Sequence, residues 1–335
     1  MNTRKLLSLI MIALVALNIA ACAPATPTAE PLTKITAIRD WPVLWPMQMY
    51  NDVGVEKGFF ADAGLDVTWE FPPQPADVVK LVGTGQAQFG IVNTVDAINA
   101  KLQGLDILIV GAAVSRDMGG IMYFKDSGMT SPADLAGKKI ANYAWPQTQL
   151  HLRAMLEHYG LTTEDVTIVD AGDYSVPLMV AGQVDAADAA AGSEDLDTQR
   201  QTGREVGIWL YVEHGVPPFY TSLIITNRQF AEENPEIVTA FLDACFKAID
   251  YTIAHLDEAV EINVKNHPDV DPTWLHDGWE IGIAPFIEPY PEDQGKPRGT
   301  VSIELVQRYM DFLYEGGLIE EKIDPASFID MSYLP

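Results

Sequence analysis

Two separate segments of the chain repeat the same local pattern. Residues 80–93 read KLVGTGQAQFGIVN and residues 177–190 read PLMVAGQVDAADAA, so each contains an aliphatic pair, Gly-Gln and a short apolar run. Upstream of them, residues 57–69 and 155–168 each combine an amphipathic run with Gly-Leu and Asp-Val-Thr. A glycine in such a place typically ends a helix in the left-handed conformation before the next strand. The repeat therefore predicts two α/β lobes of like topology around a shared cleft.

The order of elements favours mostly parallel sheets. In the first half of the chain we expect strands at 35–41, 65–71, 89–93 and 106–114, with helices at 47–64, 76–82 and 95–103. Apolar strands that alternate with helices are typical of a parallel sheet covered on both faces. From residue 115 to residue 190 the same order of elements follows.

The C-terminal part of the chain returns to the first lobe in this interpretation. Residues 221–256 read as a strand and a long helix, and the remainder is mostly helical with Pro-containing loops. We therefore assign residues 35–120 and 221–335 to lobe 1 and residues 121–220 to lobe 2 of a hinged binder. Two independent tandem domains are the alternative, which is weaker because the last segment lacks the elements of a domain.

The N-terminus has the pattern of a lipoprotein signal peptide. Two basic residues precede an uncharged apolar run that ends directly before Cys22. Residues 19–22, Ile-Ala-Ala-Cys, resemble the bacterial lipobox, which implies removal of residues 1–21 and lipidation of Cys22. An ordinary secretory signal is the alternative. Residues 22–34 are rich in Pro, Thr and Ala and are expected to form a tether, which places the protein on the extracytoplasmic face of the cell membrane.

Charge and cysteine content exclude several classes of function. The chain has 21 Lys and Arg against 47 Asp and Glu, a net charge of −26, which argues against nucleic acid and against anionic lipid as partners of the protein surface. No second segment is apolar and long enough to cross a bilayer. Cys245 is expected to pack in the core. Neither a cysteine nucleophile nor a metal site is predicted, and His151 and His158 lack a metal-binding spacing.

Five segments together resemble periplasmic binding proteins of ABC importers. They are VGVEKGFFADAGLDVTW (53–69), LVGTGQAQFGIVN (81–93), SPADLAGKKIA (131–141), LMVAGQVDA (178–186) and VEHGVPPF (212–219). They are most similar to the branch that binds the thiamine pyrimidine precursor (ThiY-like) or riboflavin (RibY-like), which is related to sulfonate and nitrate binders. The resemblance covers residues 35 to about 260.

This resemblance implies a two-lobe fold of type II, a small-molecule ligand, no cofactor, and an ABC permease and ATPase as partners. Fungal relatives with this fold are enzymes that make the pyrimidine and carry a cysteine-rich motif near iron. The present chain has too few cysteines for that motif. We therefore predict a binding protein and not an enzyme.

Ligands of such folds bind at the carboxyl ends of the strands. After the first strand, residues 40–48 read DWPVLWPMQ and offer Trp41, Trp45 and Gln48. The pyrimidine-binding branch typically reads Trp-x-Pro-Asn-x-x-His here. This chain keeps Trp41 but has one extra residue and no Asn or His, and Gln48 stands about where the His would be. Lobe packing is the alternative role of Trp45.

The remaining candidates also follow strands. Asn93 and Thr94 either contact the ligand or cap the next helix. Where a strand of lobe 2 runs into a helix, the candidates are Tyr143, Trp145, Gln147 and Thr148, because free N–H groups at a helix start bind oxygens. His151, inside that helix, is expected to pack or to face solvent. In the resembling family a glutamate contacts ring nitrogens, which implies this role for Glu213. Candidates of lower weight are Tyr174, Asp188 and Tyr220, with Asp173 and Ser175 beside Tyr174.

The residue types of these stretches favour a flat heteroaromatic ligand. They are aromatic or neutral, and they contain no Arg cluster such as sulfonate, phosphate or nitrate would require. Riboflavin is the first choice, because the lost Asn and His and the added Trp45 suit a wider ring system. The thiamine pyrimidine precursor is the alternative. A ligand-sensing receptor without a transport role is the second alternative.

Overall fold

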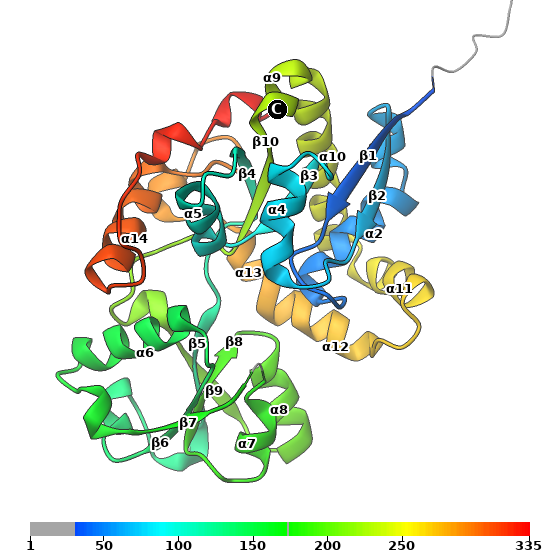
Figure 1. The fold of residues 1–335 in the computed structure, drawn as a ribbon. Coiled ribbons are helices and arrows are strands. Elements are labelled where there is room, and N and C mark those ends of the chain that lie inside the picture. Colours follow the sequence, from blue (N-terminus) through cyan, green and yellow to red (C-terminus); the bar gives the residue numbers. More distant parts are fainter. Residues whose placement is uncertain (1–30, 173) are drawn as a thin grey trace, which may run out of the picture. The chain divides into compact units, whose positions relative to one another are not determined.

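The structure is a computed structural model that describes residues 31–172 and 174–335. The predicted signal peptide, the lipidation site Cys22, most of the predicted tether and Asp173 lie outside the described residues. Residues 33–335 contain two five-stranded sheets with helices on their faces (Figure 1).

The first sheet has the strand order β2-β1-β3-β10-β4. Its strands are β1 (Thr33–Ile38), β2 (Leu65–Glu70), β3 (Phe89–Val92), β4 (Ile107–Val114) and β10 (Ser222–Asn227). β1 pairs in parallel with β2 and β3, whereas β10 is antiparallel to both of its neighbours. The helices between these strands are α2 (Met49–Glu56), α3 (Phe59–Asp62), α4 (Val78–Gly83) and α5 (Thr94–Leu102).

The second sheet repeats this plan with the order β7-β6-β8-β5-β9. Its strands are β5 (Gly119–Phe124), β6 (Lys139–Asn142), β7 (Thr167–Asp170), β8 (Ala186–Ala190) and β9 (Val206–Leu210). Here β5 is the antiparallel strand, in the place that β10 has in the first sheet. The helices that follow β6, β7 and β8 are α6 (Pro146–His158), α7 (Val176–Val180) and α8 (Glu194–Thr202).

The glycines of the sequence repeat adopt the predicted conformation. Gly64 and its counterpart Gly160 have φ values of 79° and 73°, and Gly85 and Gly182 have 72° and 65°. These values lie in the left-handed region, which a residue with a Cβ atom rarely adopts. The repeat thus marks equivalent helix ends in the two sheets. The predicted helix 47–64 is divided into α2 and α3, because Gly58 also has a left-handed φ, of 75°.

Helices of the C-terminal part cover the first sheet and extend toward the second. They are α9 (Arg228–Glu233), α10 (Pro235–Ala254), α11 (Leu256–Asn266), α12 (Pro272–Asp277), the π-helix η7 (Gly278–Ile283), α13 (Ala284–Ile287) and α14 (Ile303–Glu315). In α10, Phe241 stacks on Phe89 of β3 with 3.8 Å between the ring centroids. Cys245 of the same helix is fully buried, which confirms its predicted place in the core.

These observations confirm the predicted fold class, with two sheets flanked by helices and a helical C-terminal region. Mostly parallel sheets were expected, and the observed sheets are mixed, because each contains one strand that is antiparallel to both of its neighbours. The chain passes from the first sheet to the second at residues 115–118 and returns at residues 211–221. The exact division into lobes stays a prediction. Within the described residues, no helix has both the length and the apolar character that a membrane span needs.

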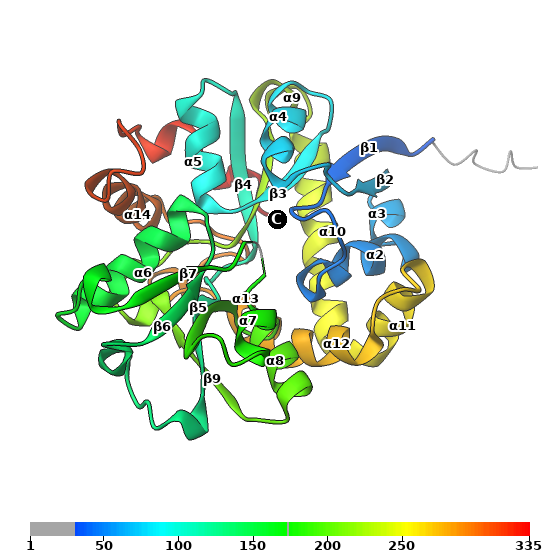
Figure 2. The same ribbon diagram turned by 60° about the horizontal axis from the view of Figure 1, so that its bottom comes forward.

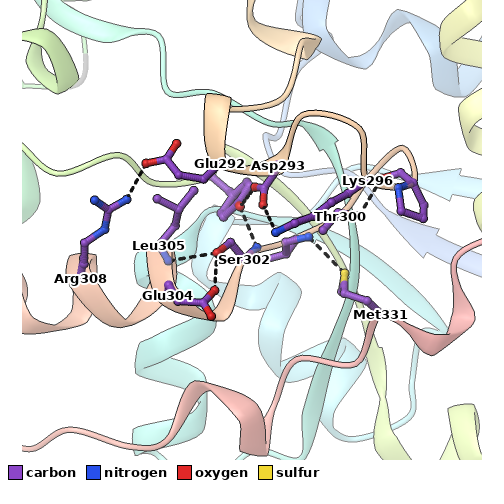
Figure 3. A network of polar contacts seen from close by, with 12 residues as sticks. Glu292, Asp293, Lys296, Thr300, Ser302, Glu304, Leu305, Arg308 and Met331 are labelled. Carbon is purple, nitrogen blue, oxygen red and sulfur yellow. Dashed lines mark hydrogen bonds and ion pairs between the residues drawn. The ribbon is translucent and has the colours of Figure 1, made fainter.

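A buried polar network holds the loop that leads into α14. The Tyr220 hydroxyl donates to Asp293 Oδ2 (2.5 Å) and accepts from the Ser302 amide (2.8 Å). The other carboxylate oxygen of Asp293 accepts from Lys296 (2.9 Å), and Ser302 caps α14 through the Leu305 amide (Figure 3). Asp293 and Tyr220 are both buried. Tyr220, a predicted ligand residue, therefore has a structural partner on each side.

We expect Tyr220→Phe to lower the free energy of unfolding by about 1–3 kcal/mol, because Asp293 and the Ser302 amide would lose a buried partner. Urea denaturation would measure this loss. Tyr314→Phe is the matched control, since the side chain of Tyr314 is exposed. Equal stability of the two variants would contradict the role given to the Tyr220 hydroxyl.

Candidate functional site

A cavity of about 250 Å³ lies between the two sheets. It is lined by residues that follow strands of both sheets and by both crossing segments of the chain. The lining residues include Asp40, Trp41, Trp45 and Asn93 from the first sheet's side, Tyr143, Trp145, Gln147, Thr148, His151, Asp188 and Glu194 from the second, and Asp117, Tyr211, Phe219 and Thr221 from the crossings. Because β1, β3, β6 and β8 all point their carboxyl ends toward it, the cavity lies where ligands of open α/β sheets bind.

Aromatic rings from both sides form the walls of the cavity. Trp41 follows β1 and Trp145 precedes α6, and their ring centroids lie 6.0 Å apart at an interplanar angle of 61°. Tyr143 lies against Trp145 with 4.9 Å between the centroids. A flat ligand in this cavity therefore meets aromatic faces contributed by both sheets.

The loop that carries the first two tryptophans is fixed from behind. Arg39 is buried and pairs with Asp52 of α2 at 2.8 Å. Gln48 donates to Asp40 Oδ1 (2.6 Å) and accepts from the backbone amide of Trp45 (3.2 Å). Gln48 does not line the cavity itself, but it positions two residues that do.

Asp188 and Glu194 form a buried acidic pair on the second sheet's side. Asp188, in β8, accepts from the Tyr211 hydroxyl, the Asn142 amide group and the Tyr143 backbone amide. Glu194, at the start of α8, accepts from the Tyr143 hydroxyl (3.0 Å) and the Ala190 amide (2.9 Å). Burial raises the pKa of Asp188 to about 8 and also raises the pKa of Glu194.

Two further carboxyl groups line the cavity. Asp117, in the first crossing, accepts from the Thr221 hydroxyl (3.1 Å) and the Gly119 amide (3.0 Å), and burial raises its pKa to about 7. Burial also raises the pKa of Asp40. Among the described residues, no Lys or Arg lines this cavity.

His151 is a neutral member of the lining. Its Nε2 atom lies 2.8 Å from the Tyr309 hydroxyl of α14, and its ring packs against Phe219 and Tyr211. Burial lowers the pKa of His151 to about 3, so the imidazole carries no charge at neutral pH. Gln147 also donates to the Tyr309 hydroxyl, at 3.3 Å. Helix α14 thereby supports this wall of the cavity from outside.

The structure brings eight of the predicted ligand residues together at the cavity. They are Trp41, Trp45, Asn93, Tyr143, Trp145, Gln147, Thr148 and Asp188. Asn93 also caps α5, because its side chain accepts from the Asp96 amide (2.9 Å). Asn93 can therefore cap the helix and line the cavity at the same time.

Other predicted ligand residues lie elsewhere. Thr94 is buried and its hydroxyl donates to the Tyr220 carbonyl (2.8 Å). Tyr174 is exposed and donates to Asp197 in a neighbouring depression. Glu213 ends the short helix after β9 and is exposed, so the structure as described gives it no contact with the cavity.

Three lining residues, Glu194, Asp117 and Thr221, were not predicted from the sequence. Glu194 follows β8 after a short turn, so its place behind a strand end was the available signal. Asp117 and Thr221 have no such signal, because they lie in irregular segments that only the pairing of the two sheets brings together. In the described part of the chain, no group of three or more His, Cys, Asp or Glu side chains has the arrangement of a metal site.

Beside the cavity, the turn after β8 packs directly against the backbone of η7, with a glycine on each side of the contact. A Cβ atom on Gly192, just after β8, would lie 2.0 Å from Gly282 Cα in η7, and one on Gly282 would lie 2.4 Å from Gly192 Cα. Helices α8 and α12 lie side by side here (Figure 2), and Arg200 pairs with Asp271 at 3.2 Å. Any side chain larger than hydrogen at either glycine would keep the two surfaces apart.

The raised pKa values predict that the empty protein loses stability as pH rises from about 6.5 to 8. In that range folded Asp188 and Asp117 retain protons that the unfolded chain has released, so the unfolded state binds fewer protons. The lowered pKa of His151 acts in the opposite direction only below its ordinary value of 6.5. Thermal unfolding of ligand-stripped protein should show a Tm that is lower by a few degrees at pH 8. Asp188→Asn should show a smaller decline, and a wild-type Tm that rises over this range would contradict the assignment.

Comparison with known proteins gives two kinds of relative. The model of the family described as "NMT1/THI5 like" matches residues 49–259. A formylaminopyrimidine-binding protein from Halalkalibacterium halodurans is 25% identical over 96% of this chain and 97% of its own length. A 4-amino-5-hydroxymethyl-2-methylpyrimidine phosphate synthase from Candida albicans is 30% identical over 68% of this chain and 69% of its own length.

Among solved structures, the periplasmic aliphatic sulphonate binding protein SsuA from Escherichia coli has a similar fold. Its TM-score is 0.68 at 17% identity, with 90% of this chain and 92% of that chain covered. At this identity the likeness concerns the two-lobe periplasmic-binding-protein fold and not the ligand. The family model covers well over half of the chain, and so the chain belongs to the NMT1/THI5 like family.

Proposed function

We propose that this protein is the extracytoplasmic solute-binding component of an ABC importer and that its ligand is a single-ring aminopyrimidine. The observation that carries the proposal is the cavity between the two sheets, which has aromatic walls from both sides and hydrogen-bonding carboxyl groups. The similarity to a formylaminopyrimidine-binding protein along nearly the whole chain supports the same ligand class.

The size of the cavity favours the pyrimidine over riboflavin, which was the first choice from the sequence. A volume of about 250 Å³ is below the range of about 300–1,000 Å³ that is usual for drug-sized ligands. One substituted ring fits this space better than a tricycle with a sugar-alcohol chain. Trp45, which suggested a wider slot, has its ring edge against Trp274 at 6.4 Å and so has a packing partner of its own.

A binding role is preferred to catalysis, although the relative from Candida albicans is named as a synthase. The alignment with the binding protein covers far more of the chain than the alignment with the synthase. Cys245, the one cysteine in the described part of the chain, is buried in α10 and burial raises its pKa, so it supplies no thiolate to the cavity. Attachment through a lipid on Cys22, and delivery to a permease with its ATPase, belong to the same proposal.

Calorimetry on ligand-stripped protein tests the ligand class. We expect micromolar or tighter binding of 4-amino-5-hydroxymethyl-2-methylpyrimidine or its 5-aminomethyl analogue, and no heat from riboflavin. Tight binding of riboflavin alone would restore the first choice. Heat from none of these compounds would contradict the proposed ligand class. Formation of a pyrimidine phosphate by the purified protein would favour the enzyme.

Trp41→Ala should weaken pyrimidine binding by about 2–4 kcal/mol, roughly 30- to 1,000-fold, because it removes an aromatic wall of the cavity. Tyr314→Ala, an exposed aromatic residue outside the cavity lining, is the control. Titration calorimetry of both variants with the pyrimidine would measure the difference. A loss below threefold for Trp41→Ala would mean that the ring of the ligand lies elsewhere.

If the lobes close around the ligand, Gly282→Ala should hinder closure without preventing folding. The new methyl group would collide with Gly192 and with the Ala191 carbonyl, and overpacking of this kind costs about 1–3 kcal/mol. We expect affinity to fall roughly 5- to 150-fold and the ligand-induced decrease in radius of gyration to become smaller in X-ray scattering. Glu280→Ala, an exposed position of the same helix, should behave as wild type. An unchanged affinity for Gly282→Ala would contradict a closed state built on this contact.

A further inference from the structure

The cavity contains acidic groups without any basic partner. Asp40, Asp117, Asp188 and Glu194 line one cavity. The side-chain hydrogen bonds that they accept come from neutral groups, which are hydroxyls, amide side chains and backbone amides. A buried carboxylate without a positive partner is costly, and the cost appears here as a raised pKa at each of the four groups.

The cations nearest in the fold are engaged elsewhere. Arg39 lowers the pKa of Asp40, but its guanidinium pairs with Asp52 and burial outweighs its effect on Asp40. Arg116, next to Asp117, donates to the Pro285 carbonyl, and Arg200 of α8 pairs with Asp271. The imidazole of His151 is neutral and contacts the Tyr309 hydroxyl. Within the described residues, the protein thus supplies no positive charge to the cavity itself.

The aromatic walls point to the same kind of ligand by a separate observation. Three aromatic side chains, Trp41, Tyr143 and Trp145, line the cavity. The centroid of each ring lies within 6.0 Å of the centroid of another of these rings. Faces of tryptophan and tyrosine attract cations, and the attraction is strongest where water is excluded. Carboxyl groups and aromatic faces in one cavity are a combination that recognises an organic ammonium ion.

We propose that the ligand enters this cavity as a cation, an aminopyrimidine that carries a primary ammonium group, and that Asp188 and Glu194 are its negative partners. The inference rests on the proposed function, because it takes the pyrimidine ring from there and adds the charge. A positive charge on the ligand distinguishes compounds that the aromatic walls alone would bind equally well. A 5-aminomethyl substituent is an ammonium ion at neutral pH, whereas a 5-hydroxymethyl substituent on the same ring is neutral.

The test compares these two compounds on the same ligand-stripped, full-length protein by titration calorimetry at pH 7.4. We expect 4-amino-5-aminomethyl-2-methylpyrimidine to bind at least tenfold more tightly than the 5-hydroxymethyl compound. This comparison needs no variant, so it does not depend on whether a mutant folds. Equal affinity, or a preference for the neutral compound, would overturn the inference and leave the proposed function intact. If neither compound binds, the proposed function itself fails.

A matched pair of variants then locates the charge. Glu194→Gln keeps the shape and one acceptor oxygen but removes the negative charge, so it should reduce the preference for the ammonium compound to below threefold. Glu213→Gln makes the same chemical change at an exposed position and should leave the preference unchanged. An unchanged preference in Glu194→Gln would exclude Glu194 as the partner of the ammonium group and overturn that part of the assignment. If Glu194→Gln does not fold, the same comparison is made with Asp188→Asn.

Discussion

The two crossings of the chain between the sheets are the constraint on which the site depends. Each sheet contains one antiparallel strand, β5 or β10, that directly follows a crossing. Because each crossing feeds an antiparallel strand into the other sheet, the carboxyl ends of the parallel strands in both sheets face one space. The two crossings lie along the side of that space. Asp117, Tyr211 and Phe219 reach the cavity for that reason. A ligand bound in this space would contact both sheets and both connections at once, so its binding would be coupled to the geometry between the lobes.

Acidic side chains dominate the electrostatics of this space. Asp117, Asp188 and Glu194 are buried, so salt screens any charge on them less than it screens surface charges. Neutral donors such as Tyr211 and Asn142 fix the orientation of Asp188 without supplying a positive charge. Under the proposed function, an arrangement of this kind would disfavour sulfonate or phosphate and favour a ligand that brings N–H groups or a positive charge. The fold is shared with a sulphonate-binding protein, but a fold does not by itself determine the ligand, which depends on the side chains that line the cleft.

Contacts outside the cavity hold its walls in place. Tyr309 of α14 supports Gln147 and His151 from behind, and the network around Asp293 and Ser302 fixes the start of that helix. On another side, the approach of Gly192 to Gly282 depends on the absence of two side chains. Residues that never meet the ligand therefore determine how closely the walls approach one another.

The sequence by itself determined the fold and part of the site. Left-handed glycines, buried apolar strands and helix starts are local features, so the repeat, the two sheets and the strand-end residues such as Trp41, Tyr143 and Asp188 could be predicted from short stretches of the chain. Tertiary structure decided which polar side chains turn inward. Glu194 lines the cavity while Glu213 is exposed, and Tyr220 bonds to Asp293 in a buried loop network. These outcomes depend on the packing of segments far apart in the chain, because the direction of a side chain in a loop is set by its neighbours in space and not by its neighbours in sequence.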